Sequence, residues 1–367
     1  MLNYKKERNK IKLRENPDLG RKVFFLNPPV KLESRIIPEL RTEEYEIYII
    51  KDYHYIKNLL RIFPTSICFI NINDKSLDSL QWFKFIRFFS EDPTLKETHL
   101  GVVTSESISW IKELFLLHTQ LPCGYNPLNK NIEELKENFT ALLDINGAKG
   151  KRKFVRADCK NDSNIFASCV VKGITVQMHV ENISTVGFCC TAPLSGQYLF
   201  QVNSVVRKLS LVINNKEIIC NTAVIIKKKG TKKLLLVFLF LQGFSYTSKT
   251  IIRDYITNYL QHTIHLIQTN LPLDTQDYSV LLKEEYDIIK SIKASALYSQ
   301  RITTQKQEEE FLNYQQEWEA FKTMDEITEL HPIEGTEKDS QSSHDPLKEE
   351  YTQTFFDKDD IQTTDLF

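Results

Sequence analysis

Residues 151–187 read KRKFVRADCKNDSNIFASCVVKGITVQMHVENISTVG and set the architecture of the middle of the chain. The stretch begins with an R-x-x-x-R pattern, Arg152 to Arg156. It ends with an N-x-S-x-x-G pattern, Asn182 to Gly187, and 25 residues separate the two. Between them, Ile165 to Lys172 and Thr175 to Val180 are apolar, β-branched segments on either side of a Gly-Ile turn. These segments predict a β-hairpin, so both patterns belong to a strand-rich domain.

The residues after Gly187 continue the strand pattern and then change to a helical one. Further strands are predicted at Leu199 to Ile213, Ile218 to Lys227 and Lys233 to Leu241, with turns at Asn214-Asn215 and Lys229-Gly230. Residues Ser248 to Gln268 have apolar side chains at helical spacing. Short antiparallel strands at this spacing predict a small barrel, followed here by a helix.

The two patterns, in this order and at this spacing, resemble the ligand signature of PilZ domains. The resemblance covers residues 151–270 and implies a six-stranded antiparallel β-barrel with a C-terminal helix. It also implies a receptor for the bacterial second messenger cyclic di-GMP, which has two phosphates and two guanines. Arginine suits both groups, because its guanidinium binds phosphate bidentately and fits the O6/N7 edge of guanine.

The first pattern supplies the positive charge of the expected site. Arg152 and Arg156 are expected to bind phosphates and guanine edges and to stack on bases. Lys151 and Lys153 add positive potential and are expected to steer the anion toward the site.

The second pattern supplies the neutral groups of the expected site. Asn182 offers a donor and an acceptor to a guanine edge, and Ser184 can donate to phosphate or base. Gly187 is expected to allow a positive φ and a close approach of backbone to ligand. The alternative is an ordinary turn at the end of a strand, for which Gly187→Ala would destabilise the fold.

Residues 21–145 alternate apolar runs with amphipathic stretches. Strands are predicted at Lys22 to Leu26, Tyr45 to Ile50, Ser66 to Ile72, His99 to Thr104 and Leu121 to Tyr125. Helices are predicted at His54 to Ile62, Leu77 to Phe89, Ile108 to His118 and Ile132 to Leu143. Strands alternating with helices favour a parallel sheet covered on both faces.

This α/β region resembles a response-regulator receiver in architecture and departs from it in chemistry. Asn27-Pro28 stands where receivers have an acidic pair, Asn71 where they have the phosphoacceptor aspartate, and Asn126 where they have a lysine; Thr104 keeps its hydroxyl. Asparagine is neutral and is a poor ligand for magnesium. We therefore expect a pseudo-receiver that is not phosphorylated on aspartate. An unrelated α/β sandwich is the alternative.

The remaining segments are expected to connect or extend these two domains. Residues 146–156 are predicted to be a flexible basic hinge that contains the R-x-x-x-R pattern, and residues 278–330 a helical extension. Residues 1–20 are predicted to be a disordered basic arm. Residues 331–367 hold ten acidic residues and three lysines, a net charge of −7, and are predicted to be a disordered acidic tail.

Composition narrows the class of protein. Of 367 residues, 41% are hydrophobic and 26% charged, with a net charge of −1, as in globular proteins. The start of the chain does not resemble a signal peptide. The longest apolar run, Leu234 to Leu241, has eight residues, whereas a bilayer needs about 20. The seven cysteines are scattered and odd in number, which disfavours a disulfide framework and favours a reducing cytoplasm.

Catalytic and metal-binding patterns are missing from the sequence. It contains no P-loop, no H-E-x-x-H and no G-x-S-x-G, and none of the GGDEF, EAL or HD-GYP signatures of cyclic di-GMP turnover. Cys189 and Cys190 are expected on opposite faces of a strand, and His262 and His265 lack a third ligand. We therefore expect no enzyme, no metal and no cofactor.

Three functions remain open. The first is a cytoplasmic bacterial cyclic di-GMP receptor that reorients its domains toward an unidentified protein partner, in motility, adhesion or another pathway. The second is a nucleotide-independent PilZ adaptor that acts through protein contacts. The third is a nucleic-acid binder, which the scarcity of aromatic residues among the basic ones and the acidic tail both disfavour.

Overall fold

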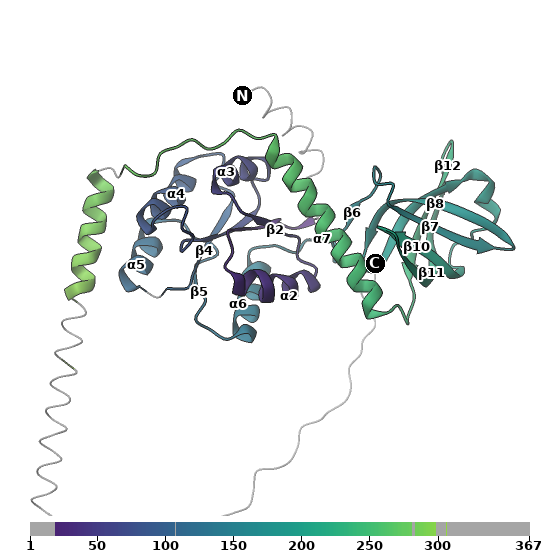
Figure 1. The fold of residues 1–367 in the computed structure, drawn as a ribbon, viewed down its shortest axis with the longest axis horizontal. Coiled ribbons are helices and arrows are strands. Elements are labelled where there is room, and N and C mark those ends of the chain that lie inside the picture. The colour runs from purple at the N-terminus through teal and green to yellow at the C-terminus, as the bar shows by residue number, and fades with distance from the viewer. Residues whose placement is uncertain (1–18, 107, 281–282, 299–305, 307–367) are drawn as a thin grey trace, which may run out of the picture. The chain divides into compact units, whose positions relative to one another are not determined.

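A computed structural model describes residues 19–106, 108–280, 283–298 and 306 of the chain (Figure 1). Two β-containing domains make up most of this part. We call residues 21–148 the α/β domain and residues 157–240 the barrel. The predicted arm, the acidic tail and the extension beyond residue 298, apart from residue 306, lie outside the described residues. Among the helices that are described, none is long and apolar enough to cross a membrane.

The α/β domain is built on five parallel strands in the order β2-β1-β3-β4-β5. The strands are β1 (Val23–Leu26), β2 (Ile47–Ile50), β3 (Ile67–Asn71), β4 (His99–Thr104) and β5 (Tyr125–Pro127). All residues of β1 and β3 are buried, as expected for strands with helices on both faces. The strand order is that of flavodoxin-like doubly wound sheets, so the predicted parallel α/β fold is confirmed.

Helices cover both faces of this sheet (Figure 1). Side chains of α3 (Tyr53–Ile62), α4 (Ser79–Glu91) and α5 (Ser109–His118) form one core, and those of α2 (Ile37–Thr42) and α6 (Ile132–Ile145) form the other. Asp52, Asp78 and Asn131 accept the first backbone N–H groups of α3, α4 and α6. These side chains fix where the helices begin because they pair donors that have no partner within the helix.

Two parts of the α/β domain differ from the sequence prediction. A π-helical turn, η2 (Leu32–Ile36), and α2 occupy a segment for which no helix was predicted. Pro38 obscured this helix, because proline interrupts helical hydrogen bonding, and the wider π turn directly before α2 accommodates it. The fifth strand begins at Tyr125, later than predicted, because Gly124 has a positive φ and ends a turn.

The barrel is closed by six antiparallel strands in the cyclic order β8-β7-β10-β11-β12-β9. They are β7 (Ile165–Val171), β8 (Ile174–Ser184), β9 (Gly187–Pro193), β10 (Val205–Ile213), β11 (Lys216–Lys229) and β12 (Lys233–Phe240), and the short β6 (Ala157–Asp158) adds to β8. Buried side chains alternate along β10 and β12 and fill the interior. The predicted six-stranded barrel is therefore confirmed.

Turn chemistry explains most of the strand register. Lys172 and Gly173 both have positive φ, as do Asn214 and Asn215, which matches the two-residue turns preferred in tight hairpins. The prediction of a strand starting at Leu199 was wrong. A 3₁₀ helix, η3 (Leu194–Tyr198), and a turn that includes Asn203 at φ 65° precede β10, although Phe200 is still buried in the core.

One long helix, α7 (Tyr246–Thr269), belongs to both domains (Figure 1). Ile252, Tyr255 and Ile256 on its first half pack in the barrel core. On its second half, Ile264 packs in the core of the α/β domain, and the Gln261 amide pairs with both backbone groups of Ile49 on the edge strand β2, at 3.0 and 2.8 Å. The helix thus links the two cores through a single rigid element.

The segment after α7 is anchored on the α/β domain by the buried Lys57. Lys57 Nζ donates to the Tyr278 hydroxyl, lies 3.4 Å from Asp274 Oδ2 and lies 3.6 Å from the centre of the Phe88 ring. Asn58 Nδ2 donates to the Pro272 carbonyl at 2.8 Å. Residues 283–298 are helical, and Ile289 and Ile292 pack in the same core as α3.

Lys57→Met should change how stability depends on pH. Burial lowers the pKa of Lys57 from 10.5 to about 8, with Asp274 opposing the shift. Between these values the native protein releases a proton that the unfolded chain still holds, so native stability rises with pH. Relative to the variant, the wild type should gain up to about 3 kcal/mol from pH 8 to pH 10.5, measured by urea unfolding. Parallel stability curves for the two proteins would contradict this.

Candidate functional site

The two predicted patterns meet on the outside of the barrel. Arg152 and Arg156 lie in the irregular segment before β6 and are exposed. Partial burial lowers the pKa of Arg156, and repulsion from the Arg152 charge lowers it further. Within the described part of the chain, neither guanidinium takes part in a hydrogen bond or an ion pair. Both keep their donors available.

Strand register puts Asn182 beside these arginines. Asn182 on β8 lies opposite Asp158 on β6 and opposite Cys189 on β9. Directly opposite residues in an antiparallel pair share one face, and Asn182 and Cys189 are both half-buried on the outer face. Burial and the Glu181 charge raise the pKa of the Cys189 thiol, and the Arg156 charge opposes this shift. Because Arg156 directly precedes β6, whose Ala157 lies opposite Ile183, the arginine segment lies beside Asn182.

The other predicted residues have different positions. Lys151 and Lys153 are exposed on the segment before β6, where they add charge near the arginines. Ser184 is buried at the end of β8, and its hydroxyl donates to the Gly187 carbonyl at 3.0 Å. This hydrogen bond closes the turn between β8 and β9, so Ser184 stabilises the turn in this structure.

The expected positive φ at Gly187 was wrong. Gly187 pairs with Leu239 of β12 and with Ser184 of β8, and its φ does not lie in the left-handed region. A Cβ at this position would lie 2.2 Å from the Phe238 carbonyl oxygen. Glycine is required because two strand backbones approach closely here, and this is the structural alternative that the sequence left open.

The sequence interpretation missed a groove on the barrel that residues of β7, β8 and β9 help to line. The groove has a volume of about 750 Å³, and its lining includes Lys160, His179, Thr191, Lys232 and Lys233. Lys160 follows Arg156 by four residues, across β6, so the chain connects this groove to the arginine segment. The Lys232-Lys233 pair in the β11–β12 hairpin was a visible signal, but only the structure shows that it lines the same groove as Lys160.

Carboxylates also lie on this surface. Glu181 is at a bulge in β8, accepts from Thr191 Oγ1 at 3.1 Å and acts on the Cys189 thiol. Asp158 lies opposite Asn182. The surface therefore offers acceptors beside the cationic donors. Guanine presents an N2–H₂ donor as well as its O6 and N7 acceptors, so such a mixed surface suits a base together with phosphate.

The carboxyl edge of the parallel sheet holds amides. Asn71 Nδ2 donates to the Asn27 carbonyl at 2.8 Å, and Asn126 Nδ2 donates to the Val102 carbonyl at 3.0 Å. Thr104 Oγ1 donates to Asn73 Oδ1 at 2.8 Å. These side chains bond to one another and to the backbone, so the edge is a neutral hydrogen-bonded network.

Six of the seven cysteines are buried. Cys189 is half-buried and Cys190 is buried, so the expected alternation is confirmed. Burial raises the pKa of Cys159 and Cys220 to about 12 and that of Cys169 to about 11. Within residues 19–298, where described, no group of three or more His, Cys, Asp or Glu side chains is placed to bind a metal.

Comparisons with known proteins give similarity to solved structures only. No protein-family model and no curated protein match the chain. The PilZ domain of YcgR from Escherichia coli with c-di-GMP is 13% identical, with 33% of this chain and 99% of that chain covered and a TM-score of 0.28. The K. pneumonia MrkH–c-di-GMP complex is 12% identical over 31% of this chain and 55% of that one, with a TM-score of 0.29. CheY4 of Vibrio cholerae, a chemotaxis response regulator, is 16% identical over 34% and 98%, with a TM-score of 0.27.

Gly187→Ala should destabilise the barrel. The new methyl group would overlap the Phe238 carbonyl, so β9 and β12 must separate, at a cost of about 1–3 kcal/mol in the free energy of unfolding. Gly196→Ala is the matched control, because a Cβ there would meet its nearest side-chain atom at an ordinary 3.7 Å. Equal thermal unfolding of wild type and Gly187→Ala would show that this close approach is wrong.

Cys189 should be the most reactive thiol of the native protein. The other six cysteines are buried, whereas Cys189 is half-buried on the outer face of β9. Titration with 5,5′-dithiobis(2-nitrobenzoate) at neutral pH should therefore modify one thiol per folded chain, and Cys189→Ser should remove this reaction. Rapid reaction of a second thiol in the folded protein would contradict the burial described here.

Proposed function

We propose that the barrel binds cyclic di-GMP on its outer surface and that the chain is a receptor without catalytic activity. The observation that carries this proposal is the pairing of β6 with β8, which brings the exposed arginine segment beside Asn182. Two guanidiniums with available donors suit phosphates and guanine edges, and the Asn182 amide suits a base.

The surroundings of the arginines support a dinucleotide ligand. Lys151, Lys153 and Lys160 add positive charge on this side of the barrel, and the groove extends the surface beyond Asn182. Asp158 and Glu181 offer acceptors for the donor edge of guanine. In this proposal Ser184 and Gly187 shape the turn that holds Asn182 in place. They affect ligand binding indirectly, because they set the conformation of this turn.

Signal transfer would use the segment that links the domains. Arg152 and Arg156 directly follow residues 149–151, which connect α6 to the barrel, so ligand bound to the arginines would also act on this connection. We propose that ligand binding changes how the α/β domain and the barrel contact each other, and that a protein partner recognises the change. The ligand produces this shift only if it binds one arrangement more tightly than the other.

Calorimetric titration with cyclic di-GMP tests the proposal. The wild type should bind with micromolar affinity, a binding free energy of about −8 kcal/mol. Arg152→Ala and Arg156→Ala should each weaken binding roughly 10- to 150-fold, because each removes charge-assisted hydrogen bonds worth about 1.5–3 kcal/mol. Their melting profiles should match that of the wild type, since both side chains are exposed.

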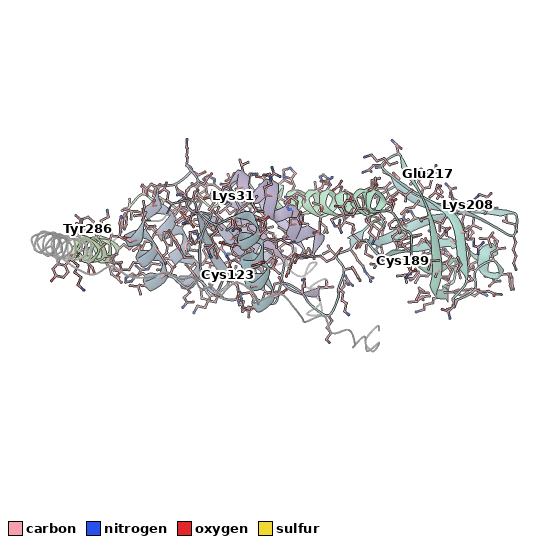
Figure 2. The ribbon with its side chains drawn as sticks, turned by 90° about the horizontal axis from the view of Figure 1, so that it is seen from below. Lys31, Cys123, Cys189, Lys208, Glu217 and Tyr286 are labelled. Carbon is pink, nitrogen blue, oxygen red and sulfur yellow. The ribbon has the colours of Figure 1, made fainter. Side chains whose placement is uncertain are left out.

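Arg207→Ala is the control for loss of a positive charge. Arg207 is exposed on β10 next to Lys208, which lies apart from Cys189 on the barrel (Figure 2). This variant should bind like the wild type. Absence of wild-type binding at tens of micromolar protein would refute the proposal and favour the nucleotide-independent adaptor. A gel shift with steep salt dependence would instead favour nucleic acid.

A further inference from the structure

Glu44 occupies an unusual backbone position for its residue type. It follows the C-terminal end of α2 with a φ of 65°, where glycine is favoured because a Cβ is sterically disfavoured. Its side chain is only 13% exposed. A charged residue that is both in a left-handed conformation and largely buried needs strong partners, and those partners lie outside the α/β domain.

Both sequence patterns of the candidate site contact the Glu44 carboxylate. The backbone N–H of Val155, inside R-x-x-x-R, donates to Oε2 at 3.0 Å. The Thr185 hydroxyl, inside N-x-S-x-x-G, donates to Oε1 at 2.8 Å. Arg253 Nη2 on α7 lies 3.9 Å from Oε1 and balances the charge. One carboxylate therefore joins two segments that are 30 residues apart in sequence.

These contacts act next to the ligand-binding side chains. Val155 immediately precedes Arg156, and its side chain packs on the barrel core. Thr185 is buried and directly follows Ser184, in the turn after Asn182. Fixing the Val155 N–H and the Thr185 hydroxyl to one carboxylate therefore fixes the separation between the arginine segment and the asparagine strand. Arg152 and Arg156 themselves remain exposed.

We propose that Glu44 is a positioning residue for the ligand site, supplied by the α/β domain. Its carboxylate holds the arginine segment against the turn before the ligand arrives, so ligand affinity depends on contact between the α/β domain and the barrel. This inference rests on the proposed function. It goes further by assigning the α/β domain a direct part in binding and by naming the residue through which the two domains are coupled.

Two variants with different effects on the fold test this role. Glu44→Ala removes both hydrogen bonds, and Thr185→Val removes one with little change in volume. Each should raise the Kd for cyclic di-GMP, by roughly 5- to 150-fold for Glu44→Ala, the usual range of coupling between sites. The double variant should bind as weakly as Glu44→Ala alone, because the two changes remove the same interaction.

Hydrogen exchange supplies a readout that does not need ligand. The Val155 amide should exchange about tenfold faster or more in Glu44→Ala, and the β11 and β12 amides should be unchanged, because the barrel itself stays folded. Glu33→Ala is the control, since Glu33 pairs with Lys51 on the surface of the same domain. It should leave both the Kd and the Val155 exchange rate at wild-type values.

The outcomes separate this inference from the proposed function. If the wild type binds cyclic di-GMP and the Kd of Glu44→Ala is unchanged or lower, the positioning role of Glu44 is wrong. The proposed ligand site is then unaffected. Absence of wild-type binding overturns both. Weaker binding in Glu44→Ala and Thr185→Val, with faster Val155 exchange in Glu44→Ala and neither effect in Glu33→Ala, supports the inference.

Discussion

The helix α7 is the constraint on which the described structure depends. Its 24 residues contribute side chains to the barrel core at Ile252 and Ile256 and to the core of the α/β domain at Ile264. A continuous helix bends little, because every turn is held by its own hydrogen bonds. Each core therefore limits where the other can lie, and the contacts of Glu44 with the barrel form within that limit.

The residues of the two sequence patterns divide between exposed polar groups and the architecture of a turn. The arginines and Asn182 present polar groups on the outer face, where a ligand can reach them. Ser184 and Gly187 are used inside the turn, through a hydrogen bond and through a close approach of two strands. A short pattern can therefore define a site while only some of its residues touch the ligand, and loss of binding on mutating the others would report on the turn.

The sequence predicted the strands and the barrel well where periodicity and turn residues agreed. Asn214-Asn215 predicted one hairpin, and the apolar run from Leu234 to Leu241 predicted the strand β12. The prediction was wrong where a local signal conflicted with packing. Pro38 interrupts the helical pattern of α2, so this helix was not predicted, and the buried Phe200 was assigned to a strand. In the candidate site, the arginines and Asn182 were predictable by type. Glu44 and the groove lysines were not, because their positions depend on contacts between elements distant in sequence.

The pairing of Gln261 with Ile49 has a consequence for the behaviour of the protein at high concentration. β2 is an edge strand, and the Gln261 amide and Arg41 Nη2 occupy backbone groups that a strand from another molecule would need. The opposite edge, β5, is three residues long and includes Pro127, which has no N–H. With the barrel closed on itself, the described strands offer little template for edge-to-edge association. Association through these strands should therefore require that they first unfold locally.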